Sequence, residues 1–384
     1  MSDRGGSERR GMRRRSRRAS AVVWVALATS FSGACAAPVP DLVILNARVF
    51  TADPSRPWAE ALAVRGARLV AVGSTAEVSA LAGPATVRRD MAGRVVIPGF
   101  NDAHVADPQL DGPGIAALAQ AAAASGITSM QWFAGGRPVD AAVAALLEAD
   151  AAQRIRLFRM PRPGPGGTTL DSGPHLPPQP SPRLDVRGMG FVLHASDGEQ
   201  IRQAVSWAYS TEDLLALEPA DDEALAQYVE AVERRGPAEV WVRKRPRVEQ
   251  PGPGAIVLAS RLAEVGMVAV ARPGGTVPLA SLVEAGVPLA LATGHGSAPF
   301  DVISWAVAPD RGAEALSVEQ ALAAFTRGSA FAEFADSEKG HLSVGALADL
   351  AVLSSDPFAR ARDGSGPPHS VLTLIGGRVV HDVP

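Results

Sequence analysis

The stretch VVIPGFNDAHVADPQL, Val95 to Leu110, carries side chains that could do chemistry at the end of an apolar run. His104 could donate an imidazole nitrogen to a metal ion, while Asp102 and Asp107 could orient that ring or act as acid and base. Each aspartate could equally cap a turn. Ala106 stands where a second histidine would complete a His-x-His pair, and alanine has no lone pair to donate. The stretch therefore reads as an incomplete metal site.

The central part of the chain alternates strand-like and helix-like segments. Apolar runs such as ITSMQWF, RIRLF, GFVL, EVWVR, MVAVAR and PLALAT alternate with amphipathic segments such as VDAAVAALLEADAAQ and AIVLASRLAEVG. This alternation predicts parallel βα units, and roughly 240 residues is typical of an eightfold barrel. We therefore predict the α/β class, with a (β/α)8 barrel over 99–340. The Pro/Gly-rich segment 161–183 is predicted to be a long loop within it.

Both ends of the chain after residue 40 are predicted to be β-rich. Residues 41–98 and 341–384 contain short runs of alternating apolar and polar positions that are separated by turn residues. Neither set has enough strands to bury a core alone. We therefore predict one β-sandwich domain formed by both chain ends.

Residues 1–36 have the pattern of an export signal, with eight arginines in the first twenty positions and then an uncharged run. That run is too short for a stable transmembrane span. Cys35 is the only cysteine, so an intramolecular disulfide is excluded. The tetrapeptide SGAC at 32–35 resembles a lipobox, although Ser32 stands where Leu or Val is usual. We predict a lipid anchor at Cys35 and a membrane-anchored lipoprotein of the bacterial cell envelope, with soluble periplasmic or secreted export as the alternative.

Composition limits the partners. The chain of 384 residues is 47% hydrophobic and can bury a large core. Its net charge is −3, and it is more acidic without the arginine-rich start, which argues against nucleic acid.

Several motifs together resemble the amidohydrolase superfamily, specifically its family 3. They are DLVILNARVFTADPSRPWAEALAVRGARLVAVGS, GRVVIPGFNDAHV, GITSM, EKGHLSVGALADLAVLSSDP and TLIGGRVVHD, and they cover most of 41–384 in order. The resemblance implies a (β/α)8 barrel flanked by a β-sandwich from both chain ends. It also implies hydrolysis of C–N bonds with one or two divalent metals.

The metal ligands that this resemblance implies are mostly substituted. Ala106 replaces the second histidine, Gly190 stands where a bridging lysine is expected, and Gln250 replaces a later ligand. The segment ATGHGSAP lacks the expected aspartate. A metal hydrolase depends on an ion that lowers the pKa of bound water from about 15.7 to near 7, so the site needs its ligands.

Two charged residues are minor alternatives for the lost groups. Lys244 could stand in for the lysine, although between Arg243 and Arg245 it reads as a solvated basic strand end. Asp301 could replace the aspartate through a shift of register.

Three hypotheses follow. The favoured one is a degenerate relative without a cofactor, which binds a small-molecule ligand or an envelope protein at the old pocket. The second is an active hydrolase of amide or cyclic amide substrates, in which His104, His194 and His295 at the ends of barrel strands hold zinc and leave a position for water. The third covers metal-free acid/base chemistry or a different role.

Overall fold

The computed structural model describes the following residues: 39–107, 109–135, 138–159, 162–163, 170–171, 179–186, 188–193, 195–294, 298–359 and 367–383. Every described residue belongs to one compact unit, Pro38–Pro384. The predicted export signal and Cys35 lie outside the described residues. No helix in the described part is long and apolar enough to cross a membrane.

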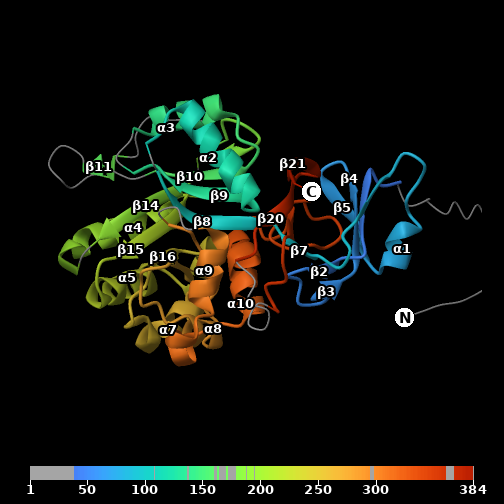
Figure 1. Ribbon diagram of the computed structural model, residues 1–384. Coiled ribbons are helices and arrows are strands. Elements are labelled where there is room, and N and C mark those ends of the chain that lie inside the picture. The colour runs from blue at the N-terminus through green and yellow to red at the C-terminus, as the bar shows by residue number, and fades with distance from the viewer. Residues whose placement is uncertain are drawn as a thin grey trace, which may run out of the picture. The chain divides into compact units, whose positions relative to one another are not determined.

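Parallel strands form two sheets in the middle of the chain (Figure 1). One sheet has the order β13 (Leu184–Asp185), β10 (Arg154–Phe158), β9 (Ile127–Phe133) and β8 (Phe100–Ala106). The other has the order β14 (Gly188–Leu193), β15 (Leu214–Pro219), β16 (Arg247–Glu249), β17 (Val268–Ala271) and β18 (Leu289–Leu291). The predicted α/β class is therefore confirmed, and the parallel sheets are consistent with a TIM-like barrel.

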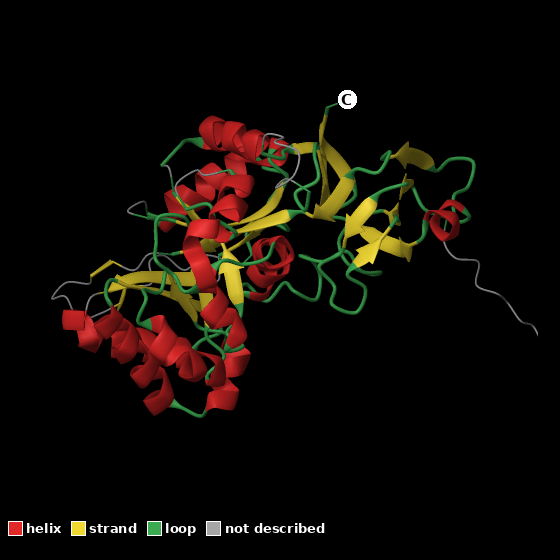
Figure 2. Ribbon diagram, turned by 60° about the horizontal axis from the view of Figure 1, so that its bottom comes forward, coloured by secondary structure: helices red, strands yellow, loops and turns green. Residues whose placement is uncertain are grey.

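Helices follow most of these strands and lie on their outer side (Figure 2). They are α2 (Gly112–Ala124), α3 (Val139–Ala149), η1 (Ala195–Asp197), α4 (Gly198–Ser210), α5 (Asp222–Arg235), α6 (Ala238–Lys244), α7 (Ala255–Glu264), α8 (Leu279–Glu284), α9 (Pro299–Ala306), η2 (Pro309–Glu314), α10 (Val318–Ala323), the π-helical turn η3 (Ala324–Gly328) and α11 (Ser329–Phe331). Helix α5 shows why they form. Asp221 caps its first turn by accepting a hydrogen bond from the Ala224 amide, and Leu225, Tyr228 and Val232 are buried at helical spacing.

The prediction of a strand at EVWVR was wrong, because these residues belong to α6. A short apolar run does not by itself distinguish a strand from a buried helical turn. Here Pro237 precedes the first turn, and only Trp241 is buried while Val242 and Arg243 are exposed. Lys244 consequently lies at a helix end, where a positive charge is favourable, and not at a strand end.

Strands from both ends of the chain pair in one sheet. Its order is β21 (Arg378–Asp382), β20 (Ser370–Ile375), β19 (Leu350–Leu353), β7 (Val95–Pro98), β2 (Arg48–Phe50) and β3 (Trp58–Ala59). A second sheet has the order β5 (Arg68–Gly73), β4 (Ala61–Arg65), β1 (Leu42–Leu45) and β6 (Val87–Asp90), and α1 (Thr75–Ser79) follows β5. The domain boundaries and the sandwich stay predictions.

Within the segment 161–183, β11 (Arg162–Pro163) and β12 (Leu170–Asp171) pair in antiparallel fashion. The sequence predicted only a loop there.

Hydrogen bonds and an ion pair connect the sheet from both ends to the parallel strands. Arg154, the first residue of β10, places its Nε 3.1 Å from the buried carboxylate of Asp349. Asp349 also accepts the Gly376 amide at 2.5 Å. Thr373 Oγ1 donates to the carbonyl of Ala123 in α2 at 2.7 Å. These contacts fix the start of β10 and the end of α2.

Gly328, at the end of η3, lies against the backbone of β18. A Cβ atom added there would overlap the carbonyl oxygen of Leu289, which cannot move without the strand. We expect Gly328→Ala to lower the free energy of unfolding by roughly 1–3 kcal/mol in urea titrations. This loss is expected although alanine has a higher helix propensity than glycine, which by itself would stabilise the turn. Gly198→Ala in α4 is the control, since the added methyl meets only the far ends of two flexible side chains, Gln227 and Arg202. Equal urea concentrations at the midpoint of unfolding for the two variants would contradict this close packing of Gly328 against β18.

Candidate functional site

His104 lies near the carboxyl end of β8, and its ring is fixed from two sides. Its Nδ1 atom is 3.0 Å from Oε2 of Glu249. The ring stacks on Phe133 with centroids 4.0 Å apart, and Phe133 stacks on Phe158 at 4.5 Å. Phe133 and Phe158 are the last residues of β9 and β10. Glu249 of β16 and Phe133 of β9, which Phe158 of β10 supports from its other face, therefore hold the imidazole in one orientation.

Arg247 and Glu249 project from the same face of β16, because they are two residues apart in a strand. The Arg247 side chain is fully buried, and its Nη2 atom is 2.6 Å from Glu249 Oε1. Nη2 also donates to the carbonyl of Ala103 in β8 at 2.6 Å, and Nη1 donates to Gln131 of β9. A guanidinium cation therefore lies beside the strand that carries His104.

The charge of Glu249 is stabilised from both sides. Burial opposes its ionisation, but Arg247 and His104 outweigh burial and hold the pKa of Glu249 below its ordinary value. A carboxylate at Nδ1 of His104 favours a proton on that nitrogen and leaves Nε2 as the possible base or ligand. Arg247, Glu249 and His104, here called the charge triad, form one connected network.

Gln250 has a structural role beside the charge triad. Its Nε2 donates to the Arg272 carbonyl at 2.9 Å, and its Oε1 accepts the Arg272 amide at 2.9 Å. Both amide atoms are therefore used in joining β16 to the end of β17. The Arg272 guanidinium in turn lies 2.5 Å from Glu218 at the end of β15.

Asp102 and Asp107 both accept hydrogen bonds from the backbone. Asp102 is fully buried, and its Oδ1 accepts the amides of His104 at 3.2 Å and Thr293 at 3.0 Å. Thr293 Oγ1 donates to Oδ2. Burial raises the pKa of Asp102 to about 6, although these hydrogen bonds lower it. Asp107 accepts the Gln109 amide at 2.8 Å, so both aspartates make the contacts of turn caps, and a catalytic role stays a prediction.

The proposed zinc ligands are only partly visible, because His194 and His295 lie outside the described residues. Within the described ranges no group of three or more His, Cys, Asp or Glu side chains could hold a metal ion. Lys244 donates to the Thr211 carbonyl at 2.6 Å. Asp301 accepts the Ala298 amide at 3.2 Å in the first turn of α9. Neither charge contacts the charge triad.

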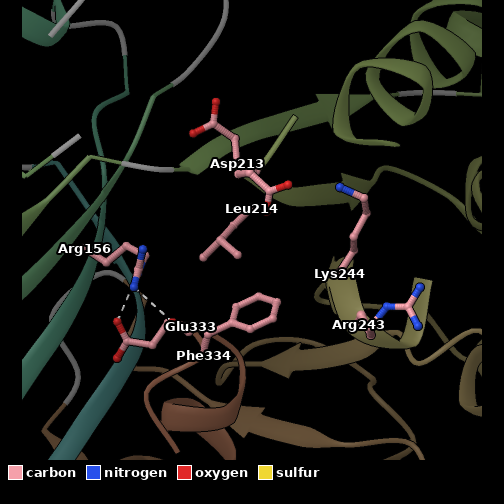
Figure 3. Close-up of a pocket in the computed structure, with 8 residues that line it drawn as sticks. Arg156, Asp213, Leu214, Arg243, Lys244, Glu333 and Phe334 are labelled. Carbon is pink, nitrogen blue, oxygen red and sulfur yellow. Dashed lines mark hydrogen bonds and ion pairs between the residues drawn. The ribbon is translucent and has the colours of Figure 1, made fainter. Parts of the chain in front are cut away.

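Figure 3 shows a pocket of about 300 Å³ that none of the three residues of the charge triad lines. Three of its six charged lining residues are in ion pairs. Arg156 contacts Glu333 at 3.3 Å, and Asp213 contacts Arg159 at 2.6 Å. Leu214 and Phe334 supply its apolar surface. Neither His104 nor Glu249 lines it, so this pocket is separate from the residues that could do chemistry.

Sequence reasoning missed Arg247 and Glu249 and singled out their neighbour Gln250. The available signal was the tripeptide RVE, in which two opposite charges would share one face of a buried strand. Charged side chains on a buried face need hydrogen-bond partners inside the protein. The tripeptide therefore indicates a buried polar site.

Comparison with known proteins identifies the class. The profile of the Amidohydrolase family matches residues 107–381, so this chain belongs to the amidohydrolase family. A segment of 67 residues is 39% identical to the protein LONG AFTER FAR-RED 3 of Arabidopsis thaliana, and one of 64 residues is 44% identical to N-substituted formamide deformylase of Arthrobacter pascens. Each match covers 17% of this chain and only 12% of the relative.

Solved structures share the fold. An adenosine deaminase from Xanthomonas campestris with bound zinc has a TM-score of 0.69 at 18% identity, covering 89% of this chain and 93% of that one. A triazine hydrolase variant has a TM-score of 0.68 at 17% identity, covering 89% and 94%. A metal-dependent hydrolase from Pyrococcus furiosus has a TM-score of 0.66 at 13% identity, covering 83% and 99%.

Replacing Arg247 tests the charge triad. Arg247→Met leaves Glu249 buried beside His104 alone, so we expect a loss of roughly 3–5 kcal/mol in the free energy of unfolding at pH 7. In the wild type the pKa of Glu249 lies below its ordinary value of 4.5, so its contribution to stability is complete at all pH values above that. In the variant, burial without Arg247 should raise the pKa of Glu249, so that the carboxyl group takes up a proton as the pH falls from 7. The deficit of the variant should therefore shrink between pH 7 and pH 4 in urea titrations.

Arg261→Met is the matched control for this experiment. It removes a similar ion pair, 2.6 Å from Glu233, on the exposed side of α7. Such surface pairs contribute at most about 1 kcal/mol. An equal loss in both variants would show that Arg247 is not a buried charge partner.

Proposed function

We propose that this protein is a degenerate amidohydrolase that has lost the usual metal centre and binds a small-molecule ligand or an envelope protein at the carboxyl ends of its parallel strands. The observation that carries this proposal is the contact of Arg247 with Glu249, whose second oxygen faces His104. The chain supplies a fixed internal cation beside its first barrel strand.

The described side chains do not fit the metal centre that the family implies. Ala106 and Gly190 have no side-chain atom that could bind a metal ion. Both side-chain amide atoms of Gln250 are already hydrogen-bonded to the backbone of Arg272. An ion on Glu249 would lie within roughly 5 Å of the Arg247 guanidinium, where a divalent and a unit positive charge repel by roughly 7 kcal/mol at an effective dielectric of about 20. The carboxylate is thus a poor ligand here.

The proposal includes a complete (β/α)8 barrel and a sandwich from both chain ends. Isolated parallel bridges join Arg159 to Met189 and Val105 to Gly294, at the facing edges of the two parallel sheets, which supports closure. One buried apolar cluster contains Ile44 and Leu62 from the four-stranded sheet together with Val96, Leu350 and Leu374 from the six-stranded one. This shared core supports the sandwich.

A second candidate is an active zinc hydrolase of amide or cyclic amide substrates, with His104, His194 and His295 as ligands. The contact of Glu249 with Nδ1 of His104 favours it, because zinc-bound histidines usually donate their second N–H to a carboxylate. The partial likeness to N-substituted formamide deformylase suits an amide substrate. In this case zinc would activate a water molecule, and Glu249 would hold the ring of His104 in place.

Metal content distinguishes the two candidates. We expect well below one equivalent of zinc in untagged protein purified without chelators, both before and after zinc addition and dialysis. Ala106→His should also show no amide hydrolysis, because Gly190 and Gln250 still leave an ion short of ligands. About one equivalent of zinc, lost in His104→Ala together with activity, would instead establish the second candidate.

The proposal also includes export of the protein and a lipid anchor at Cys35. It includes no nucleic-acid partner. A diacylated cysteine holds a protein on a membrane, whereas a cleaved signal peptide alone does not. Cys35→Ala should therefore move the protein from the membrane fraction to the soluble fraction in cell fractionation. An unchanged distribution of that variant would rule the anchor out.

A further inference from the structure

The pocket of about 300 Å³ in Figure 3 lies at the amino ends of two parallel strands. Leu214 is the first residue of β15, and Lys244 is the last residue of α6, which precedes β16. His104 lies near the carboxyl end of β8, and parallel bridges align the strands of the two sheets. The pocket is therefore at the opposite end of the strands from His104, and its volume suits a small organic molecule.

Two apolar side chains, those of Leu214 and Phe334, lie in the middle of this pocket between Arg156 on one side and Lys244 on the other (Figure 3). Phe334 is 41% exposed, and its backbone is left-handed with a φ of 63°, which is unfavourable for a residue with a large side chain. The guanidinium of Arg245 lies over its ring, 4.5 Å from the centroid. An exposed aromatic ring held on a strained backbone is a feature of ligand-binding positions.

The charged side chains that are not paired leave an excess of positive charge. Three charged lining residues take part in no ion pair of the described residues, and they are Glu212, Arg243 and Lys244. Two cations therefore stand against one carboxylate. Lys244 Nζ donates one of its three hydrogens to the Thr211 carbonyl at 2.6 Å, which fixes the ammonium group and leaves it two donors.

We propose that this pocket binds a small aromatic carboxylate. The carboxylate accepts hydrogen bonds from Lys244 Nζ, and the aromatic ring packs on Leu214 and Phe334. Charge-assisted hydrogen bonds of this kind are stronger than those between neutral groups, so the carboxylate decides the preference. The inference adds a second binding site to the proposed function and does not depend on it, because the charge triad takes no part.

The test is calorimetric titration of the full-length protein at pH 7.5 and low ionic strength. The probes are 3-phenylpropionate, 3-phenylpropan-1-ol and 3-phenylpropylamine, which share the ring and differ in charge, and acetate, which lacks the ring. We expect 3-phenylpropionate to bind at least tenfold more tightly than the alcohol and acetate, with the amine weakest of the ring compounds. Equal affinity for acid and alcohol, tighter binding of the amine, or no binding of the acid at millimolar concentration would overturn the proposal.

Replacing Lys244 locates the site. Lys244→Met keeps an apolar side chain of similar length and should weaken 3-phenylpropionate at least tenfold, because it removes the charged donor. Arg202→Met is the matched control, since it removes the same charge from an exposed ion pair on α4 that does not line the pocket. The control should bind the acid as the wild type does. Wild-type affinity in Lys244→Met would contradict this site.

Two further variants keep the proposal testable if Lys244→Met does not fold. Glu212→Gln, at an exposed position, should strengthen binding of the acid by roughly twofold to fivefold, because it removes a like charge. Phe334→Asn should weaken it about tenfold through loss of the ring contact, and asparagine adopts the left-handed backbone more readily than phenylalanine. Wild-type affinity in both variants would show that the acid binds elsewhere.

The two proposals fail separately. One equivalent of zinc together with binding of the acid that depends on Lys244 would overturn the loss of the metal centre and leave the second site standing. Absence of acid binding in zinc-free protein would overturn the second site alone.

Discussion

The buried guanidinium of Arg247 is the constraint on which the carboxyl end of the parallel strands depends. Taking an arginine out of water costs several kcal/mol unless its donors are satisfied. Its acceptors come from Glu249 on β16, Gln131 on β9 and the Ala103 carbonyl on β8. Because β16 belongs to one parallel sheet and β8 and β9 to the other, this side chain requires a defined placement of both sheets.

The strand β8 is held at three points along its length. Asn101 donates to Glu333 at 2.7 Å near its start, the Ala103 carbonyl accepts from Arg247, and His104 contacts Glu249 near its end. Glu333 is itself buried, and Lys339 and Arg156 overcome the effect of burial and keep its pKa below the ordinary value. A network of buried charges therefore anchors the start of β8, just as the charge triad anchors its end. Val105, Ala106 and the residues after them lie beyond these three anchors.

Much of the fold could be predicted from the sequence, whereas the charge triad could not. The runs ITSMQWF and RIRLF became β9 and β10 because apolar, β-branched and aromatic residues favour buried strands. The stack of Phe133 on Phe158 depends on the register that places these residues side by side in adjacent strands, and a sequence does not state its register. The contact between His104 and Glu249 joins positions 145 residues apart. The family resemblance pointed to Gln250 because that residue occupies the usual position of a metal ligand. It gave no sign that the neighbouring Glu249 is the charge partner of His104.

A buried ion pair fixes geometry, but its charges are then no longer available to a ligand. Glu249, Glu333 and Asp349 each have such a pair. Each carboxylate also contacts a residue that is distant in sequence: His104 for Glu249, Arg156 for Glu333 and Arg154 for Asp349. Asp102 has only neutral donors, which hold its carboxylate in place without neutralising it. Its hydrogen bonds to the Thr293 amide and hydroxyl join β8 to the segment after β18, so Asp102 fixes the geometry here with neutral groups, as the paired carboxylates do elsewhere with charged ones.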